Sequence, residues 1–430
     1  MIGRWWFRTE VFLHAYLVMV LGCIYFLFNF VEGISFAERA GESTLFRGAW
    51  LLLYILLMLH IAVDRKRFGL LMLQSHLYLT FVAFALVSLA LSADPAGASI
   101  KFAMYLLTTL FSAWVVISCP VDRLVDTLFR IGIAVLIVHV LLFPVIGSQW
   151  DYDPLHRPTV LGTQAYAGVF GHKNLAGAFF GLMVLICFVR MLAGPRRQFG
   201  WSLLLMGCHL FALAAAGAAG PLISMLTALA VTFGLLLVVL GHRGAASIYW
   251  LGLAFVALVM FAVPSDELYG LVGRSGNLTG RSFLWAVWPH FFWQHPWLGY
   301  GFSGFFNELP NSPVNELTSM APWNTEFGSF ENSYLDAFLQ FGLLGGAFYM
   351  LLLARALWNT IVFTFERRGM YWLAPFAMLL FVVIASANDS SQLLHNYFGC
   401  VLVFWCYFGP EARLQMAPRR AFARLRVSEA

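Results

Sequence analysis

Residues 222–241 read LISMLTALAVTFGLLLVVLG, a run of twenty residues without a charged side chain. A helix of about 20 apolar residues is long enough to cross the ~30 Å hydrocarbon core of a bilayer. Similar runs occur near residues 11–31, 47–63, 69–92, 100–119, 128–147, 173–193, 201–218, 247–263, 335–357, 371–387 and 396–410. The sequence therefore predicts an all-α integral membrane protein with about twelve transmembrane helices.

The composition points to the same class of protein. Of the 430 residues, 61% are hydrophobic and 11% are charged, whereas roughly a quarter of a soluble domain is charged. The net charge of +5 is modest, and a nucleic-acid-binding protein would need a basic face in a water-filled setting. No segment between the apolar runs is long enough for a soluble domain, so residues 1–430 are interpreted as a single polytopic membrane domain.

The positions of Lys and Arg predict how the chain is oriented. With a cytoplasmic N-terminus, 19 of the 26 Lys and Arg residues fall on the cytoplasmic side, in agreement with the positive-inside rule. Both termini are then cytoplasmic, and residues 148–172 and 264–334 are extracytoplasmic. The second segment is a large loop before the tenth helix, and such loops usually carry function. We expect a multi-pass protein of a bacterial inner membrane with its chemistry on the extracytoplasmic side.

The first outer loop ends on a polar cluster, His172, Lys173 and Asn174. This cluster stands where a loop becomes a helix, so cationic side chains and unpaired backbone amides are expected to face an anion together. The alternative is that Lys173 extends to the membrane interface and Asn174 caps the helix.

The large loop carries two arginines, Arg274 and Arg281, each next to a glycine. The positive-inside rule disfavours arginine in extracytoplasmic segments. A planar guanidinium can bind phosphate oxygens in a bidentate manner. Both are therefore candidates for phosphate binding. The alternative is a structural ion pair with Asp266, Glu267 or Glu308.

The large loop ends in the polar sequence ENSYLD at residues 331–336. Loss of solvent at an apolar helix end favours a protonated carboxyl group, which suits Glu331 as a general base near neutral pH. Asn332 and Tyr334 are candidate substrate-binding residues on the same segment. The alternative is ordinary helix capping by Asn332 or Ser333, with Glu331 near the first turn.

Two weaker features lie in the outer loops. Asp151 and Asp153 have the D-x-D spacing with which many glycosyltransferases hold a divalent metal, although such short matches also arise by chance. Residues 283–293 contain six aromatic side chains, which we interpret as an interfacial anchor in preference to a surface that stacks on substrate.

An ordered series of motifs resembles a known family, the O-antigen ligase and Wzy-type polysaccharide polymerase superfamily, which includes exopolysaccharide polymerases. The motifs are GVFGHKNLAG (168–177), GRSFLW (280–285), HPWLGYG (295–301), NSYL (332–335) and FGLLG (341–345). The resemblance covers roughly residues 165–350, whereas the helices before it are similar only in being apolar.

The resemblance implies a membrane glycosyltransferase that takes its glycan from an undecaprenyl-diphosphate-linked oligosaccharide on the periplasmic face and transfers it to an acceptor glycan. It implies no nucleotide sugar, no cofactor and no metal. Loop arginines are thought to bind the donor diphosphate in this family, and the arginine of the GR-x-x-x-W motif corresponds to Arg281. The expected partners are the donor, the acceptor, membrane lipid and a chain-length regulator or export complex.

The chain departs from the ligase pattern at two places. Glu331 stands where ligases typically have a histidine, and AGAAGP at residues 216–221 replaces a Ser-Arg pair that many relatives have. Both departures favour a polymerase over a ligase that attaches glycan to a lipid core or protein. A polysaccharide transporter or flippase is the alternative from another class, but it would place ionisable residues along a path through the membrane.

Overall fold

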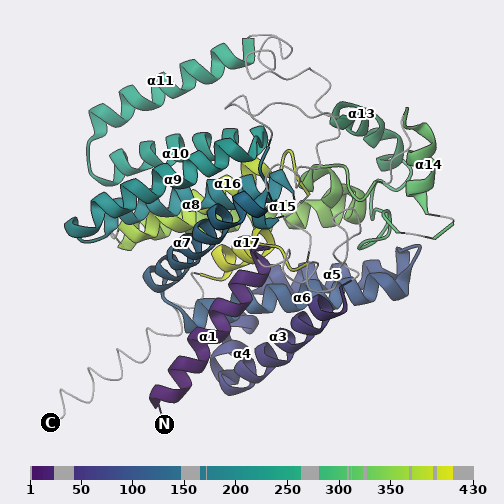
Figure 1. The fold of residues 1–430 in the computed structure, drawn as a ribbon. Helices are drawn as coiled ribbons and strands as arrows, with labels where there is room; N and C mark the ends of the chain where they lie inside the picture. The colour runs from purple at the N-terminus through teal and green to yellow at the C-terminus, as the bar shows by residue number, and fades with distance from the viewer. Residues whose placement is uncertain are drawn as a thin grey trace, which may run out of the picture. The chain divides into compact units, whose positions relative to one another are not determined.

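The regular secondary structure of the described residues is helical. The computed structural model describes residues 2–23, 43–146, 165–170, 172–262, 280–307, 309–310, 312–322, 327–367, 370–390 and 395–409, and no strand occurs among them. The α-helices (Figure 1) are α1 (Ile2–Val20), α3 (Thr44–Val63), α4 (Arg65–Gln74), α5 (His76–Ser88), α6 (Pro95–Ser118), α7 (Val121–Ile146), α8 (Lys173–Ala193), α9 (Phe199–Ala216), α10 (Ala219–Val239), α11 (Arg243–Ala262), α13 (Arg281–Phe292), α14 (Pro313–Met320), α15 (Ser333–Arg367), α16 (Leu373–Ala385) and α17 (Phe398–Phe408).

Many of these helices could span a membrane. Within the described residues, seven are long and apolar enough, namely those of α3, α6, α7, α8, α9, α10 and α15, and the bent pair of α4 and α5 would make an eighth. Shorter apolar helices lie in α1, α11, α16 and α17. The chain is thus an all-α, multi-pass membrane protein. Each of the twelve predicted runs overlaps one of these helices, while the count of twelve spans and the side on which each loop lies stay predictions.

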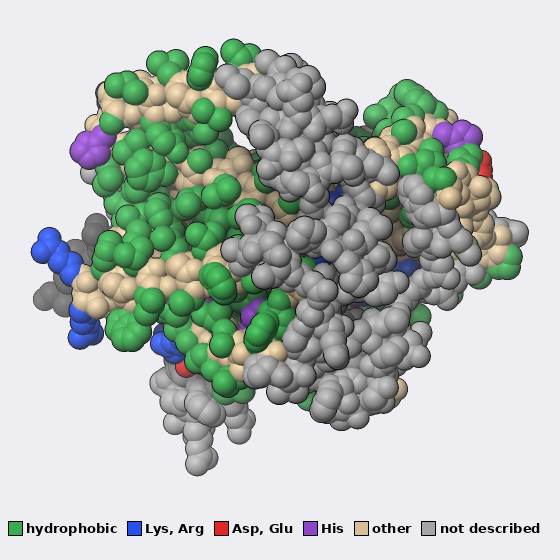
Figure 2. Space-filling model, turned by 45° about the horizontal axis from the view of Figure 1, so that its top comes forward, with side chains coloured by type: hydrophobic (Ala, Val, Ile, Leu, Met, Phe, Trp, Pro, Cys, Tyr) green, Lys and Arg blue, Asp and Glu red, His purple; other side chains and the backbone are tan. Residues whose placement is uncertain are grey.

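The surface of the described helices is apolar, as lipid contact requires. Exposed large side chains include Leu51 on α3, Phe211 on α9 and Leu251 on α11. Figure 2 shows hydrophobic side chains over much of the visible described surface, and one group of blue Lys and Arg side chains at its left edge. A soluble protein rarely exposes such a large apolar area.

The predicted span at residues 69–92 is bent. The axes of α4 and α5 differ by 84° at Ser75. The hydroxyl of Ser75 donates to the carbonyl of Leu71 at 2.8 Å, and its N–H donates to the carbonyl of Met72 at 3.0 Å. These bonds satisfy the polar groups at the break, which apolar surroundings would otherwise penalise.

The chain forms two compact units, each built from three segments. The first contains Met1–Phe68, Ala113–Phe233 and Thr360–Ala385, and α8 is its central helix. α8 contacts α7, α9 and α16, and every residue from Phe179 to Val189 is buried. Gly177 allows this close packing, because a Cβ atom there would lie 2.6 Å from the Cβ of Ala218.

The second unit contains Gly69–Ser112, Gly234–Asn359 and Ser386–Ala430. In it the described part of the large loop forms its own apolar core around α13 and α14. Phe291 and Phe292 are buried there, whereas Trp293 is 69% exposed. The predicted interfacial aromatic face is therefore wrong for Phe291, whose ring packs against Phe305 and Phe330 of the loop, and for the buried Phe292.

Gly342 breaks α15 and gives the HPWLGYG motif a structural role. Gly342 has φ 62° and ψ −166°, and a Cβ atom there would lie 2.3 Å from the backbone carbon of Trp297. The N–H of Leu343 donates to the carbonyl of Pro296 at 2.7 Å, and the N–H of Tyr300 donates to the carbonyl of Leu339 at 3.0 Å. The loop backbone thus replaces helical hydrogen bonds that the break removes.

Candidate functional site

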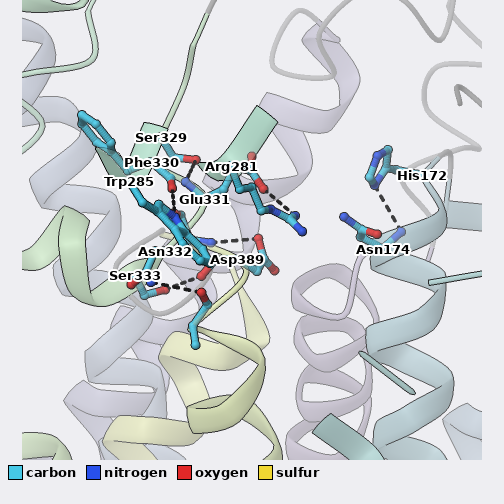
Figure 3. A network of polar contacts seen from close by, with 12 residues as sticks. His172, Asn174, Arg281, Trp285, Ser329, Phe330, Glu331, Asn332, Ser333 and Asp389 are labelled. Carbon is cyan, nitrogen blue, oxygen red and sulfur yellow. Dashed lines mark hydrogen bonds and ion pairs between the residues drawn. The ribbon is translucent and has the colours of Figure 1, made fainter. Parts of the chain in front are cut away.

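Two predicted site residues, Arg281 and Glu331, lie in contact in the second unit. The Nη2 atom of Arg281 donates to the Oε2 atom of Glu331 at 2.9 Å. The side chains are 19% and 42% exposed, respectively, so both can be reached by a ligand. Figure 3 shows this contact between the start of α13 and the segment that leads into α15. The acidic partners that we considered for Arg281 from the sequence did not include Glu331.

Two tryptophans hold α13 against the segment that carries Glu331. The indole N–H of Trp285 donates to the carbonyl of Phe330 at 3.1 Å, and that of Trp288 donates to the carbonyl of Leu335 at 3.0 Å. Arg281 is the first residue of α13, after Gly280 at φ 86°. The two indole hydrogen bonds therefore fix the position of α13, and with it the backbone from which the Arg281 side chain extends. This gives the spacing of the GR-x-x-x-W motif a physical reason.

The backbone of Glu331 has an unusual conformation. Its φ is 53°, in the left-handed region that side chains with a Cβ adopt at a cost of about 1 kcal/mol or more. Its N–H donates to the hydroxyl of Ser329 at 3.2 Å. Strained residues of this kind gather at functional sites, which agrees with a working role for Glu331.

Asn332 caps α15, as the alternative interpretation of this segment expected. Its Oδ1 atom accepts from the N–H groups of Tyr334 at 3.0 Å and Leu335 at 3.2 Å. Its Nδ2 atom donates to the carbonyl of Ala387 at 3.0 Å. The Asn332 side chain is thus engaged within the protein, and Tyr334 lies partly buried in the first turn. Their binding of substrate stays a prediction.

The structure adds Asp389, a residue that the sequence reasoning missed. The N–H and the hydroxyl of Ser333 both donate to the carbonyl of Asp389, at 3.1 and 2.8 Å. The N–H of Ser333 also donates to the carbonyl of Ser386 at 2.9 Å. These bonds hold residues 386–390 against the start of α15 (Figure 3). The available signal was the polar run Asn388-Asp389-Ser390 between the last two apolar runs.

The surroundings of Asp389 favour its protonated form. Burial raises the pKa of Asp389 from 3.8 to about 6, and the negative charge of Glu331 adds to this shift. The N–H of Ser390 and the charge of Arg281 act in the opposite direction. Arg281, Glu331 and Asp389 are therefore electrostatically coupled, and Asp389 is a carboxyl group that can exchange a proton near neutral pH.

The raised pKa of Asp389 predicts how the stability depends on pH. A group with a raised folded-state pKa stabilises the fold below its unfolded pKa, and that contribution is lost as the pH rises through the folded value. Asp389→Asn keeps an Oδ1 acceptor for the N–H of Ser390 and removes the titration. We expect the stability of the wild type relative to Asp389→Asn to fall between pH ~4 and ~6. Thermal unfolding in detergent measures this, and a pH-independent difference would contradict it.

The predicted anion cluster of the first unit has a simpler local structure. The Nδ1 atom of His172 accepts from the N–H of Asn174 at 3.2 Å (Figure 3), so His172 caps α8. The alternative that Asn174 is the cap is wrong, because α8 begins at Lys173 and Asn174 is its second residue. Anion binding by His172, Lys173 and Asn174 stays a prediction.

Other predicted residues lie outside the described residues. These are Arg274, Asp151 and Asp153. Within the part that the structure describes, no group of three or more His, Cys, Asp or Glu side chains could hold a metal ion.

The fold and this site define a multi-pass membrane protein with a charged site at the polar end of a long span. Residues 201–350, which include Arg281 and Glu331, match the family model Wzy_C, O-Antigen ligase. The chain is 25% identical over 337 residues to "Exopolysaccharide production protein ExoQ" of Rhizobium meliloti (strain 1021), covering 72% of this chain and 70% of that protein. The predicted resemblance to the O-antigen ligase and Wzy-type polymerase superfamily is confirmed by these matches.

Proposed function

We propose that the chain is a membrane glycosyltransferase that uses an undecaprenyl-diphosphate-linked glycan as donor. It transfers this glycan to a hydroxyl of an acceptor glycan on the extracytoplasmic face of a bacterial inner membrane. The product is exopolysaccharide or O-antigen built from repeat units. The contact between Arg281 and Glu331 carries this proposal, because it places a cation for an anionic leaving group beside a carboxylate that can accept a proton.

The reaction we propose is a displacement at the anomeric carbon of the donor. The acceptor oxygen forms a bond to that carbon, the bond from the carbon to the diphosphate oxygen breaks, and undecaprenyl diphosphate leaves as an anion. Arg281 stabilises the charge that grows on the diphosphate. A guanidinium has five N–H donors, and the Glu331 contact uses one of them. Arg281 can therefore hold the leaving group without releasing Glu331.

Glu331 is the proposed acceptor of the hydroxyl proton. It is the more exposed partner of the pair, at 42%, so an acceptor sugar can approach its carboxylate. Hydrogen bonding to Glu331 also orients the attacking oxygen, which lowers the entropy cost of the step. Arg274 is proposed as a second donor to the diphosphate.

The fate of the glycan distinguishes a polymerase from a ligase. The name of the Rhizobium meliloti relative refers to exopolysaccharide production, which favours a polymerase here. Deletion of the gene is then expected to leave single repeat units on the lipid carrier. Full-length but unattached polymer would indicate a ligase, and unchanged glycan would contradict both. Donor confined to the cytoplasmic leaflet would indicate a flippase.

A chain-length regulator or export complex is a further expected partner.

The proposal requires a defined orientation in the membrane, which cysteine labelling tests. Five of the six natural cysteines are buried, and Cys208 is exposed. The Cys208→Ser variant should therefore show little background labelling by a thiol reagent. In that background, an impermeant thiol reagent added from outside should label Ser275→Cys and Asn324→Cys but not Arg197→Cys or Arg367→Cys. Labelling of residues 264–334 from the cytoplasm alone would exclude the proposed function.

A further inference from the structure

Asp336 is a buried carboxylate that the proposed reaction does not use. It lies in the first turn of α15 and is 4% exposed. Its Oδ1 atom accepts from the N–H of Phe330 at 3.0 Å, and its Oδ2 atom bonds to the hydroxyl of Ser390. Burying a carboxylate is costly unless its oxygens are hydrogen-bonded, so both contacts are important for this side chain.

The two partners of Asp336 are neighbours of the other two acidic groups of the site, Glu331 and Asp389. Phe330 precedes Glu331, and Ser390 follows Asp389. One side chain therefore connects two segments that are more than fifty residues apart in the sequence. The contacts of Ser333 with Asp389 and Ser386 run beside this connection. Asp336 bonds to both segments at once from its place on α15, and the bond from Asn332 to the carbonyl of Ala387 is a second link between them.

The connection also extends to Arg281. The N–H of Phe330 is held by Asp336, and its carbonyl accepts from the indole of Trp285 on α13. The ring of Phe330 is fully buried against Phe291, Phe305 and their neighbours. Phe330 is thus fixed through its N–H, its carbonyl and its ring, immediately before the strained backbone of Glu331.

We infer that Asp336 is a positioning residue, which sets the geometry of Arg281, Glu331 and Asp389 by hydrogen-bonding Phe330 and Ser390. The inference rests on the proposed function in so far as that geometry serves glycan transfer. Asp336 itself is too buried to touch a substrate. Its action depends on hydrogen bonds and not on its charge, because an amide of the same shape offers an acceptor to Phe330 and a donor to the oxygen of Ser390.

Asp336→Asn and Asp336→Leu separate hydrogen bonding from shape. Both side chains have nearly the shape of aspartate, but leucine leaves the N–H of Phe330 and the hydroxyl of Ser390 buried without a partner. We expect Asp336→Asn to keep transfer within about fivefold and Asp336→Leu to lower it about 100-fold, since a displacement of about 1 Å at reacting groups has that effect. Asn359→Leu is the matched control. Asn359 is a buried residue about six turns further along α15 whose amide donates to the carbonyls of Cys406 and Tyr407.

Amide hydrogen exchange gives a readout that does not depend on activity. In the purified full-length protein, Asp336→Leu should speed exchange in peptides covering residues 327–335 and 386–390, whereas Asp336→Asn and Asn359→Leu should not. Unchanged exchange in Asp336→Leu would overturn the inference, and so would an Asp336→Asn variant as impaired as Asp336→Leu. If the wild type transfers no glycan, the proposed function fails while the exchange data still decide the role of Asp336.

Substitutions of Ser390 keep the test valid if Asp336→Leu does not fold. Ser390→Ala removes one of the two contacts, and Ser390→Thr retains a hydroxyl. We expect Ala to speed exchange at residues 386–390 and lower transfer about tenfold, with Thr close to the wild type. Equal behaviour of the two variants would contradict the connection through Asp336.

Discussion

Arg281→Lys is expected to lower glycan transfer about 30- to 150-fold, although the charge is kept. Lysine can still pair with Glu331, but its ammonium cannot present the planar set of donors that a diphosphate accepts in a bidentate manner. The loss of one charge-assisted contact corresponds to ~2–3 kcal/mol in the transition state. Arg281→Ala should be at least as inactive. The measurement is the transfer rate of purified protein with a polyprenyl-diphosphate-linked oligosaccharide.

The stability of the same variants separates this role from a structural ion pair. The Arg281–Glu331 pair is partly exposed, and exposed pairs stabilise proteins by only about 0–1 kcal/mol. Arg281→Ala should therefore unfold at nearly the wild-type temperature while its activity is lost. Arg243→Lys, at an exposed position that begins α11, is the matched control and should transfer normally. Near-normal transfer by well-folded Arg281→Ala would remove Arg281 from the mechanism.

Glu331→Gln is expected to lower activity by about 10²- to 10⁴-fold, the range typical for loss of a general base. Glutamine keeps the length of the side chain and a hydrogen-bonding group while it removes the proton acceptor. If Glu331 serves only the local structure, the same change should leave activity within a few-fold and lower stability by no more than about 1 kcal/mol. Full activity in this variant would leave acceptor activation without a residue.

Two further substitutions of Glu331 use its backbone conformation. Histidine occupies the left-handed region more readily than most residues, and its imidazole can accept a proton near neutral pH, so Glu331→His should recover part of the activity. Glycine has no Cβ and relieves the strain at φ 53°. Glu331→Gly should therefore be inactive, while its free energy of unfolding should exceed that of the wild type by up to about 1 kcal/mol. A Gly variant as active as the wild type would show that only the turn matters.

The sequence was sufficient to predict the apolar helices and to single out two residues that the structure brings into contact. Apolar length predicts a span because the bilayer thickness sets it, and all twelve predicted runs overlap helices. Arg281 stood out because arginine is scarce in the outer segments, and Glu331 because it is a carboxyl group at the apolar end of a helix. Neither argument could show that they touch, because a contact across fifty residues depends on how α13 packs against the start of α15.

The roles of Asp389, Ser390 and Gly342 could not be predicted from a sequence pattern of fixed spacing. Asp389 and Ser390 reach the site through bonds to Ser333 and Asp336, which no local pattern predicts. The break at Gly342 depends on the close approach of the backbone at Trp297, and a lone glycine in an apolar run usually stays helical. Tertiary packing determines both the position of Asp389 and Ser390 at the site and the helix break at Gly342.

Reconstituted transfer is the most direct test of the proposed reaction. Purified protein in liposomes would receive an undecaprenyl-diphosphate-linked oligosaccharide and an acceptor glycan, without nucleotide sugar. We predict a lengthened glycan together with one released undecaprenyl diphosphate per transfer, and neither product with Arg281→Ala. Folded wild-type protein that leaves the donor intact, or that forms the same products with Arg281→Ala, would contradict it.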